Sequence, residues 1–282
     1  MNAHSRDVGA AAGHIRADRV TIRLGEGAGA FEAVSEASFE VRPGEFVCLL
    51  GPSGCGKSTL LGAMAGHIRP ASGTFSVDGH PIDGPHPERG IVFQQHTLFP
   101  WKNVRDNVAF GLKMRGVKRG PRRLEADRML ELVGLAGSAD RYPGQLSGGM
   151  QQRVEIARVL INQPKLLLMD EPFGALDALT RLRMQELLLD IWEQFRKTIV
   201  FVTHDIDEAL LLADRIIVMQ AQPGRIHEEI RVPFERPRST DIITSGTFMQ
   251  LKQHCLSLLH GDRRQDTLTR LSPLGAVRAA KA

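Results

Sequence analysis

A short apolar run that leads directly into a glycine-rich turn is the feature that most limits what this chain can fold into. Residues 46–50 are apolar and precede Gly51-Pro52-Ser53-Gly54-Cys55-Gly56-Lys57-Ser58-Thr59. This order predicts a buried strand, a phosphate-binding loop and the start of a helix. Glycines let backbone N–H groups approach phosphate oxygens, because no Cβ blocks the turn. Lys57 would reach the β- and γ-phosphates, Ser58 would bind Mg²⁺, and the helix N-terminus favours an anion. We therefore predict that these nine residues bind a nucleoside triphosphate.

Length and composition place the chain among ordinary globular proteins. Its 282 residues are enough for one large or two small domains, and the net charge of +4 is too small to predict a nucleic-acid partner. No apolar run approaches the ~18 residues that a membrane span needs, and the first residues lack the apolar segment of a signal peptide. The three cysteines, Cys48, Cys55 and Cys255, have no disulfide or metal-ligand spacing. These observations predict a cytosolic chain with reduced cysteines.

The pattern along the chain predicts an α/β core that carries an inserted helical block. Residues 1–16 are small and polar and are expected to be disordered, and 19–24 and 38–41 alternate like half-exposed strands. From about residue 95 to 160 the sequence is helical, and strand-like runs then alternate with helical ones. We expect the core domain to span 17–235. The remainder, 236–282, is expected to form a helix followed by a loose tail.

Two acidic residues follow a later apolar strand. Residues 165–169 predict that strand, and Asp170 and Glu171 come directly after it. A carboxylate at the carboxyl end of a strand beside the P-loop can hold Mg²⁺, which is the role predicted for Asp170. Glu171 would then be aimed at the γ-phosphate as a base or water-orienting group. Two solvated acids in a turn are the alternative, which the P-loop makes the less favoured interpretation.

A second possible anion site precedes another helical run. Leu146-Ser147-Gly148-Gly149 places a hydroxyl and backbone N–H groups at a predicted helix N-terminus. The alternative is an ordinary helix capped by Ser147. One chain cannot easily bring this segment to its own P-loop across the helical block, whereas a facing second chain could.

Taken together, the motifs resemble those of the ATP-binding subunit of an ABC transporter. Their order along the chain is the P-loop, Gln94, Leu146-Ser147-Gly148-Gly149, Asp170-Glu171, Ala175-Leu176-Asp177 and His204. The resemblance covers roughly residues 17–235, and the segment at 146–149, called the signature segment below, is specific to this class of P-loop protein. Met150, the next residue, differs from the glutamine that most often follows this segment in the family, but that position varies among its members. The implied fold is a P-loop ATPase core with an antiparallel β subdomain and an inserted helical subdomain.

This resemblance implies a role for each remaining motif. Gln94 would sense Mg²⁺ and the attacking water, and His204 would contact the γ-phosphate. Ser147, Gly148 and Gly149 would bind the nucleotide held by the opposite subunit, and Asp177 would cross the dimer interface. Glu171, His204 and Gln94 are thus the expected catalytic residues, and Ser58, Gln94 and Asp170 the expected Mg²⁺ ligands.

The adenine-binding residue is the least well defined part of the predicted site. The family usually stacks adenine on an aromatic residue upstream of the P-loop, but the early strand of this chain ends at Leu24. The nearest aromatic residue is Phe31. Phe31 could stack on adenine, or Phe31 could be a core residue and Leu24 a weaker apolar platform.

The resemblance also implies partners. ATP would be held between two ATPase subunits, expected to be identical copies, and separate transmembrane permease subunits would bind near Phe99-Pro100-Trp101 at the cytoplasmic face of the membrane. Ordinary packing of a loop is the alternative for Phe99 and Trp101, and for Phe99 it is the favoured interpretation. A finer resemblance is to the ATPase subunits of importers for nitrate, sulfonate or taurine, which work with a solute-binding protein. It rests on the short tail and on the sequence of residues 92–94, 98–104 and 106–108. A soluble ABC-type ATPase without a membrane partner is the alternative.

Overall fold

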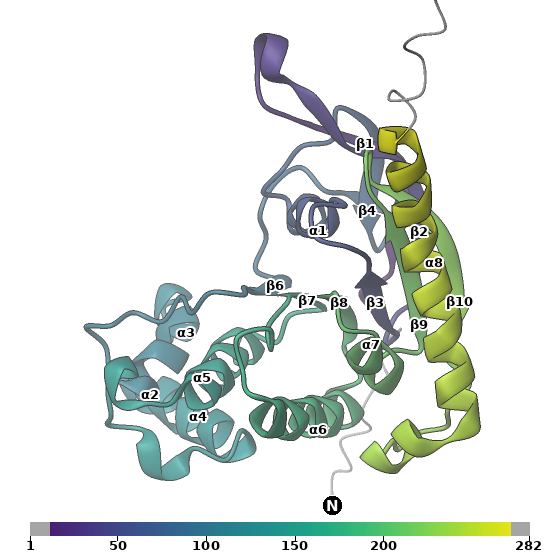
Figure 1. Cartoon of the computed structure of the whole chain (residues 1–282). Helices are drawn as coiled ribbons and strands as arrows, with labels where there is room; N and C mark the ends of the chain where they lie inside the picture. Colours follow the sequence, from purple (N-terminus) through teal and green to yellow (C-terminus); the bar gives the residue numbers. More distant parts are fainter. Residues whose placement is uncertain (1–11, 272–282) are drawn as a thin grey trace, which may run out of the picture.

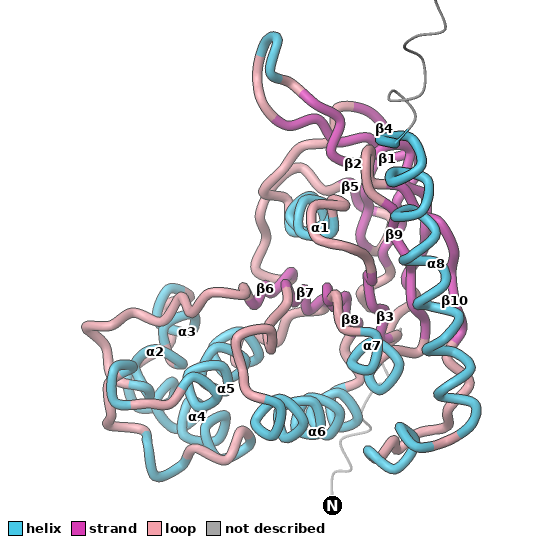
Figure 2. Tube along the Cα trace, in the orientation of Figure 1, coloured by secondary structure: helices cyan, strands magenta, loops and turns pink. Residues whose placement is uncertain are grey.

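Two β-sheets and a block of helices make up the computed structural model, which describes residues 12–271 (Figures 1 and 2). The smaller sheet is antiparallel and has the order β2-β1-β4-β5. Its strands are β1 (Ile15–Leu24), β2 (Phe31–Val41), β4 (Ser72–Val77) and β5 (His80–Pro81). The first two are longer than the sequence pattern predicted, and they form a hairpin that projects from the body of the molecule (Figure 1).

The larger sheet is parallel except for one edge strand. Its order is β10-β9-β3-β8-β7-β6, with only β10 antiparallel to its neighbour. Its strands are β3 (Phe46–Leu50), β6 (Arg89–Val92), β7 (Leu166–Asp170), β8 (Thr198–Thr203), β9 (Arg215–Gln220) and β10 (Arg225–Arg231). In such sheets ligands bind outside the carboxyl ends of the strands. The segments after β3, β7 and β8 therefore meet at one edge.

Strand β3 is buried on both faces, which explains its continuous apolar sequence. Phe46, Cys48 and Leu50 pack into one hydrophobic cluster, together with the helices on that side of the sheet. Val47 and Leu49 point the other way and pack into a second cluster with helix α1 (Lys57–Ala65) and the antiparallel sheet. The strand that leads into the P-loop is thus held from both sides.

Helices fill the middle and the lower part of the molecule. The block at the lower left of Figure 1 contains α2 (Val104–Val108), α3 (Phe110–Met114), α4 (Arg119–Leu132) and α5 (Gly148–Leu160). Helices α6 (Ala178–Phe195) and α7 (Ile206–Leu212) pack below the parallel sheet, and α8 (Gly246–Leu271) runs alongside β9 and β10. This arrangement confirms the predicted α/β class with an antiparallel sheet and an inserted helical block.

The N-terminal boundary differs from the prediction. Strand β1 begins at Ile15, inside the range expected to be disordered, because Asp78 accepts hydrogen bonds from the backbone N–H groups of Gly13 and His14 and anchors the start of the strand. The rest of that prediction, at residues 1–11, lies outside the described residues, and so do residues 272–282 of the segment predicted to form a helix and a loose tail. None of the helices within 12–271 has the length and apolar character of a membrane span.

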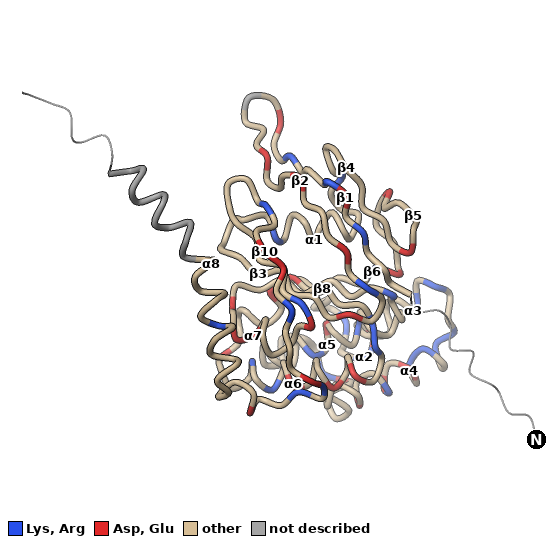
Figure 3. The backbone as a smooth tube through the Cα atoms, turned by 90° about the vertical axis from the view of Figure 1, so that its right-hand side faces the viewer, with Lys and Arg blue, Asp and Glu red and all other residues tan. Residues whose placement is uncertain are grey.

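Charged residues of both signs are interspersed around the two sheets (Figure 3). The described cysteines are free and buried, as expected for reduced packing residues.

Candidate active site

The glycine-rich turn forms the connection between β3 and α1. Its last glycine, Gly56, has φ +91°, and a Cβ there would lie 2.7 Å from the carbonyl oxygen of Ala33, so a larger residue would be strained and would collide with β2. Lys57 is 4% exposed, and its ammonium donates hydrogen bonds to the carbonyl oxygens of Gly51 and Pro52, at 2.8 Å each. The lysine charge therefore lies inside the turn of the loop that the sequence predicts to hold phosphate.

The residues predicted to bind Mg²⁺ from the P-loop and from β7 are in direct contact. Ser58 Oγ donates a 2.8 Å hydrogen bond to Asp170 Oδ1. Burial raises the pKa of the Asp170 carboxyl, and the nearby charge of Glu171 raises it further. A hydroxyl and a carboxylate in contact are hard oxygen donors, which fit Mg²⁺.

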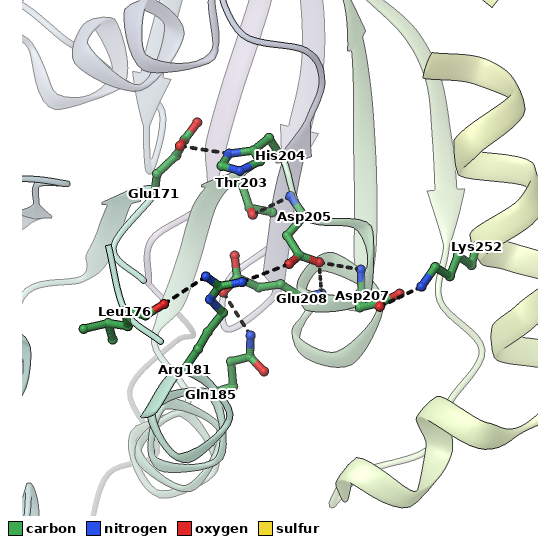
Figure 4. A network of polar contacts seen from close by, with 10 residues as sticks. All are labelled: Glu171, Leu176, Arg181, Gln185, Thr203, His204, Asp205, Asp207, Glu208 and Lys252. Atoms are coloured by element: carbon green, nitrogen blue, oxygen red, sulfur yellow. Dashed lines mark hydrogen bonds and ion pairs between the residues drawn. The ribbon is translucent and has the colours of Figure 1, made fainter. Parts of the chain in front are cut away.

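Glu171 and His204 meet across the ends of two neighbouring strands. Glu171 Oε2 lies 3.0 Å from His204 Nδ1, and the two side chains point toward each other from β7 and β8 (Figure 4). The backbone N–H of Glu171 donates to the carbonyl oxygen of Val202, also at 3.0 Å. Glu171 has φ +42°, a left-handed conformation that is uncommon outside glycine and is often found at functional sites.

Gln94 lies beside this pair. It follows β6 and is exposed, and a Cβ added at Gly174 would be 3.8 Å from Gln94 Nε2 and 3.9 Å from Glu171 Oε2. The Gln94 amide and the Glu171 carboxylate therefore lie on either side of the space that a side chain at Gly174 would fill. The structure places Gln94, Asp170, Glu171 and His204 at the carboxyl edge of the parallel sheet.

The signature segment lies elsewhere. Ser147 is the N-cap of α5, and its Oγ accepts a hydrogen bond from the backbone N–H of Met150. Gly148 faces Leu176, and a Cβ at Gly149 would lie 2.6 Å from Thr180 Cγ2, so the glycine is needed for α5 to pack on α6. Among residues 12–271, no hydrogen bond joins this segment to the P-loop.

Asp177 is the N-cap of α6, where its carboxylate accepts a hydrogen bond from the backbone N–H of Thr180. Hydrogen bonding to Thr180 holds the pKa of Asp177 below its ordinary value. Asp177 thus stays ionised at the end of the loop that starts with Glu171.

The two candidates for the adenine platform are paired across the β1–β2 hairpin. Leu24 lies directly opposite Phe31, so their side chains share one face of the hairpin. Phe31 is 59% exposed, whereas Leu24 is partly buried against the second hydrophobic cluster. Phe31 is therefore not a core residue, and it lies two residues before Ala33, whose backbone contacts the P-loop.

Phe31→Ala is expected to weaken ATP binding by roughly five- to a hundredfold, because stacking of a base on an aromatic side chain contributes about 1–3 kcal/mol. The dissociation constant of a fluorescent ATP analogue would measure the loss. Trp101→Ala, which removes an exposed aromatic residue outside this hairpin, is the matched control. An unchanged dissociation constant for Phe31→Ala would leave Leu24 as the platform.

A polar network behind His204 was not predicted from the sequence. Asp205 Oδ1 caps α7 by accepting from the N–H groups of Asp207 and Glu208, and Gln185 Nε2 donates to Glu208 Oε1 (Figure 4). Burial raises the pKa of Glu208. The sequence predicts the helix itself at Ile206–Leu212, as the structure has it, and Asp205 followed by Glu208 has the spacing of its N-terminal cap.

Comparisons with known proteins identify the family of this chain. Residues 34–174 match the family model described as "ABC transporter". Two curated relatives carry the name "Taurine import ATP-binding protein TauB". The protein of Ruegeria pomeroyi is 50% identical over 81% of this chain and 87% of its own length. The protein of Chromobacterium violaceum is 48% identical over 89% of this chain and 98% of its own length. A solved dimeric ATP-binding cassette, in a post-hydrolysis state with ADP and Pi, is 34% identical with a TM-score of 0.70 and covers 78% of this chain and 100% of its own. The cbiO1 protein from Clostridium perfringens, part of the cbiONQ transporter complex, is 30% identical with a TM-score of 0.70, over 77% of this chain and 88% of its own.

Proposed function

This chain belongs to the ABC transporter family as an ATP-hydrolysing subunit, and from that premise we propose that it drives an importer for taurine or a related sulfonate or nitrate-like solute. The proposed complex contains two copies of this chain, transmembrane permease subunits and, outside the membrane, a solute-binding protein. The ATPase would lie at the cytoplasmic face of the membrane. The names of the taurine-import relatives support the class of solute.

One observation carries the proposed chemistry: the contacts Ser58–Asp170 and Glu171–His204 lie side by side at the carboxyl edge of one sheet, next to the P-loop. Lys57 and the loop N–H groups would hold the β- and γ-phosphates. Mg²⁺ held by Ser58, Asp170 and Gln94 would neutralise charge on those phosphates. Glu171 would orient or deprotonate the attacking water, and His204 would contact the γ-phosphate.

A second copy of the chain is proposed to complete each site. Ser147 and Gly148 are exposed, whereas Gly149 is buried, and within residues 12–271 no hydrogen bond joins them to the chain's own P-loop. Two chains facing each other head to tail would place each signature segment against the partner's nucleotide. The dimeric solved relative with ADP and Pi supports this arrangement.

A groove on the helical block is the proposed contact with the permease. Its volume is about 550 Å³, and it is lined by β6, the segment after Gln94, α3 and α5. Phe99 packs on Phe110 with ring centroids 4.7 Å apart, whereas Met114 at the rim is 62% exposed. Arg89, Arg115 and Arg158 line the same groove. Arg158 is already paired with Glu155, and the charges of Arg89 and Arg115 favour a partner segment that combines apolar and acidic residues.

The test is recovery of partners from native membranes in mild detergent, with the chain tagged. Recovery of a polytopic membrane protein is expected, and Met114→Glu is expected to reduce it by at least about tenfold, because the new carboxylate would compete with acidic residues of the partner for the groove's arginines and would remove an apolar contact. Met249→Glu is the matched control, since Met249 is also exposed on a helix but lies on α8. Hydrolysis of ATP by the isolated variants should be unchanged.

Recovery of ribosomes or of DNA with no membrane protein would contradict the transport proposal and favour the soluble alternative. Equal recovery with both methionine variants would contradict the groove as the docking surface and leave the ATPase assignment in place.

A further inference from the structure

Arg181, on the first turns of α6, contacts two segments that carry the proposed catalytic residues. Its Nη2 donates a 3.0 Å hydrogen bond to the carbonyl oxygen of Leu176, and its Nη1 lies 3.4 Å from Asp205 Oδ2 (Figure 4). Leu176 ends the loop that begins at Glu171, and Asp205 directly follows His204. A single guanidinium thus joins the segment after β7 to the segment after β8.

The Asp205 end of this connection is fixed in place. Asp205 uses its other carboxylate oxygen to accept the N–H groups of Asp207 at 2.9 Å and Glu208 at 3.2 Å, and its own N–H donates to Thr203 Oγ1 at 3.0 Å. Its position is therefore set by α7 and by the end of β8. Arg181 holds the loop of Glu171 to this fixed point.

The guanidinium lies close behind the Glu171–His204 pair. Arg181, Glu171, His204, Asp205 and Glu208 line the same small cavity of about 20 Å³, which is the size of roughly one water molecule. Arg181 Nε is buried there and has no hydrogen-bond partner among the described residues. Because the cavity has so little free space, a shift of the loop at residues 171–176 would change the contact between Glu171 and His204.

We propose that Arg181 is a positioning residue for ATP hydrolysis: its guanidinium ties the Glu171 loop to Asp205 and so keeps the Glu171 carboxylate aligned with His204. This inference rests on the proposed catalytic roles of Glu171 and His204. Arg181 would not touch the nucleotide. Its loss would therefore alter turnover and leave nucleotide binding in place.

The test is a double-mutant cycle on kcat, using the purified full chain. Arg181→Met removes both contacts, while Asp205→Asn keeps an oxygen for capping α7 and replaces the oxygen that faces Arg181 by an amide. Each single variant is expected to lower kcat by roughly tenfold or more, because small misplacements of reacting groups are costly. The KM for ATP and the nucleotide dissociation constant should stay within about twofold of the wild type.

The coupling between the two positions separates this role from a general effect on stability. The double variant should be no slower than the slower single variant, because both remove the same connection. Arg183→Met, at an exposed position on the same helix, is the control and should retain wild-type kcat. Thermal unfolding midpoints of all variants show whether the fold is kept, and Arg181→Lys, which keeps a cation, replaces Arg181→Met if that variant fails to fold.

Wild-type kcat in a folded Arg181 variant would overturn the inference, and so would losses that multiply in the double variant. Either outcome would leave the proposed function intact, provided that the wild type hydrolyses ATP and Glu171→Gln does not. Absence of hydrolysis by the wild type would instead overturn the proposed function, and this inference with it.

Discussion

Glu171→Gln is expected to lower the kcat of ATP hydrolysis by at least about a hundredfold, the usual contribution of a positioned general base. The substitution preserves the size of the side chain and a polar atom opposite His204 Nδ1, which lies 3.0 Å from Glu171 Oε2. It removes the negative charge that would orient or deprotonate water. Because Lys57, Ser58 and Asp170 are untouched, ATP binding should persist, and the ATP-bound dimer should accumulate.

Two measurements on the same protein test this prediction. Steady-state phosphate release gives kcat, and size-exclusion chromatography with ATP shows whether the dimer persists. Glu186→Gln is the control, since Glu186 is exposed on α6 and the charge change is the same. Near-normal turnover in Glu171→Gln would contradict the role assigned to Glu171, whatever happens to the dimer.

The elements around the P-loop could be predicted from the sequence because their signals are local. Residues 46–50 are apolar without interruption, and this marks a strand buried on both faces, as β3 is. Asp170 and Glu171 follow an equally apolar run, and the rule that ligands bind at the carboxyl ends of parallel strands places them beside the P-loop. Ser58 and Asp170, 112 positions apart, are indeed hydrogen-bonded.

The parts that could not be predicted depend on contacts between distant elements. Arg181 and Asp205 lie 24 positions apart on different elements, and nothing in either local sequence indicates the pairing. The need for glycine at 149 also comes from another helix, because Thr180 occupies the space of a side chain. The start of β1 was placed too late because its anchor, Asp78, is contributed by the segment after β4.

The second large effect is expected at Lys57. Lys57→Ala should weaken ATP binding by roughly ten- to a hundredfold, since hydrogen bonds to charged groups contribute about 1.5–3 kcal/mol. The buried ammonium donates to the carbonyl oxygens of Gly51 and Pro52, and those contacts keep it within the loop that would surround the phosphates. The substitution therefore removes both a charge for the nucleotide and two bonds that hold the loop together.

Comparison of two nucleotides separates these contributions. If Lys57 reaches the β- and γ-phosphates, Lys57→Ala should reduce ATP affinity strongly and AMP affinity little, as measured by competition with a fluorescent analogue. Lys113→Ala, which removes an exposed lysine from α3, should change neither. Equal losses for ATP and AMP would mean that Lys57 acts by holding the loop together, and unchanged ATP affinity would contradict its assignment to the nucleotide site. A loss confined to ATP is the expected result, because only ATP has phosphates at the positions that the ammonium would reach.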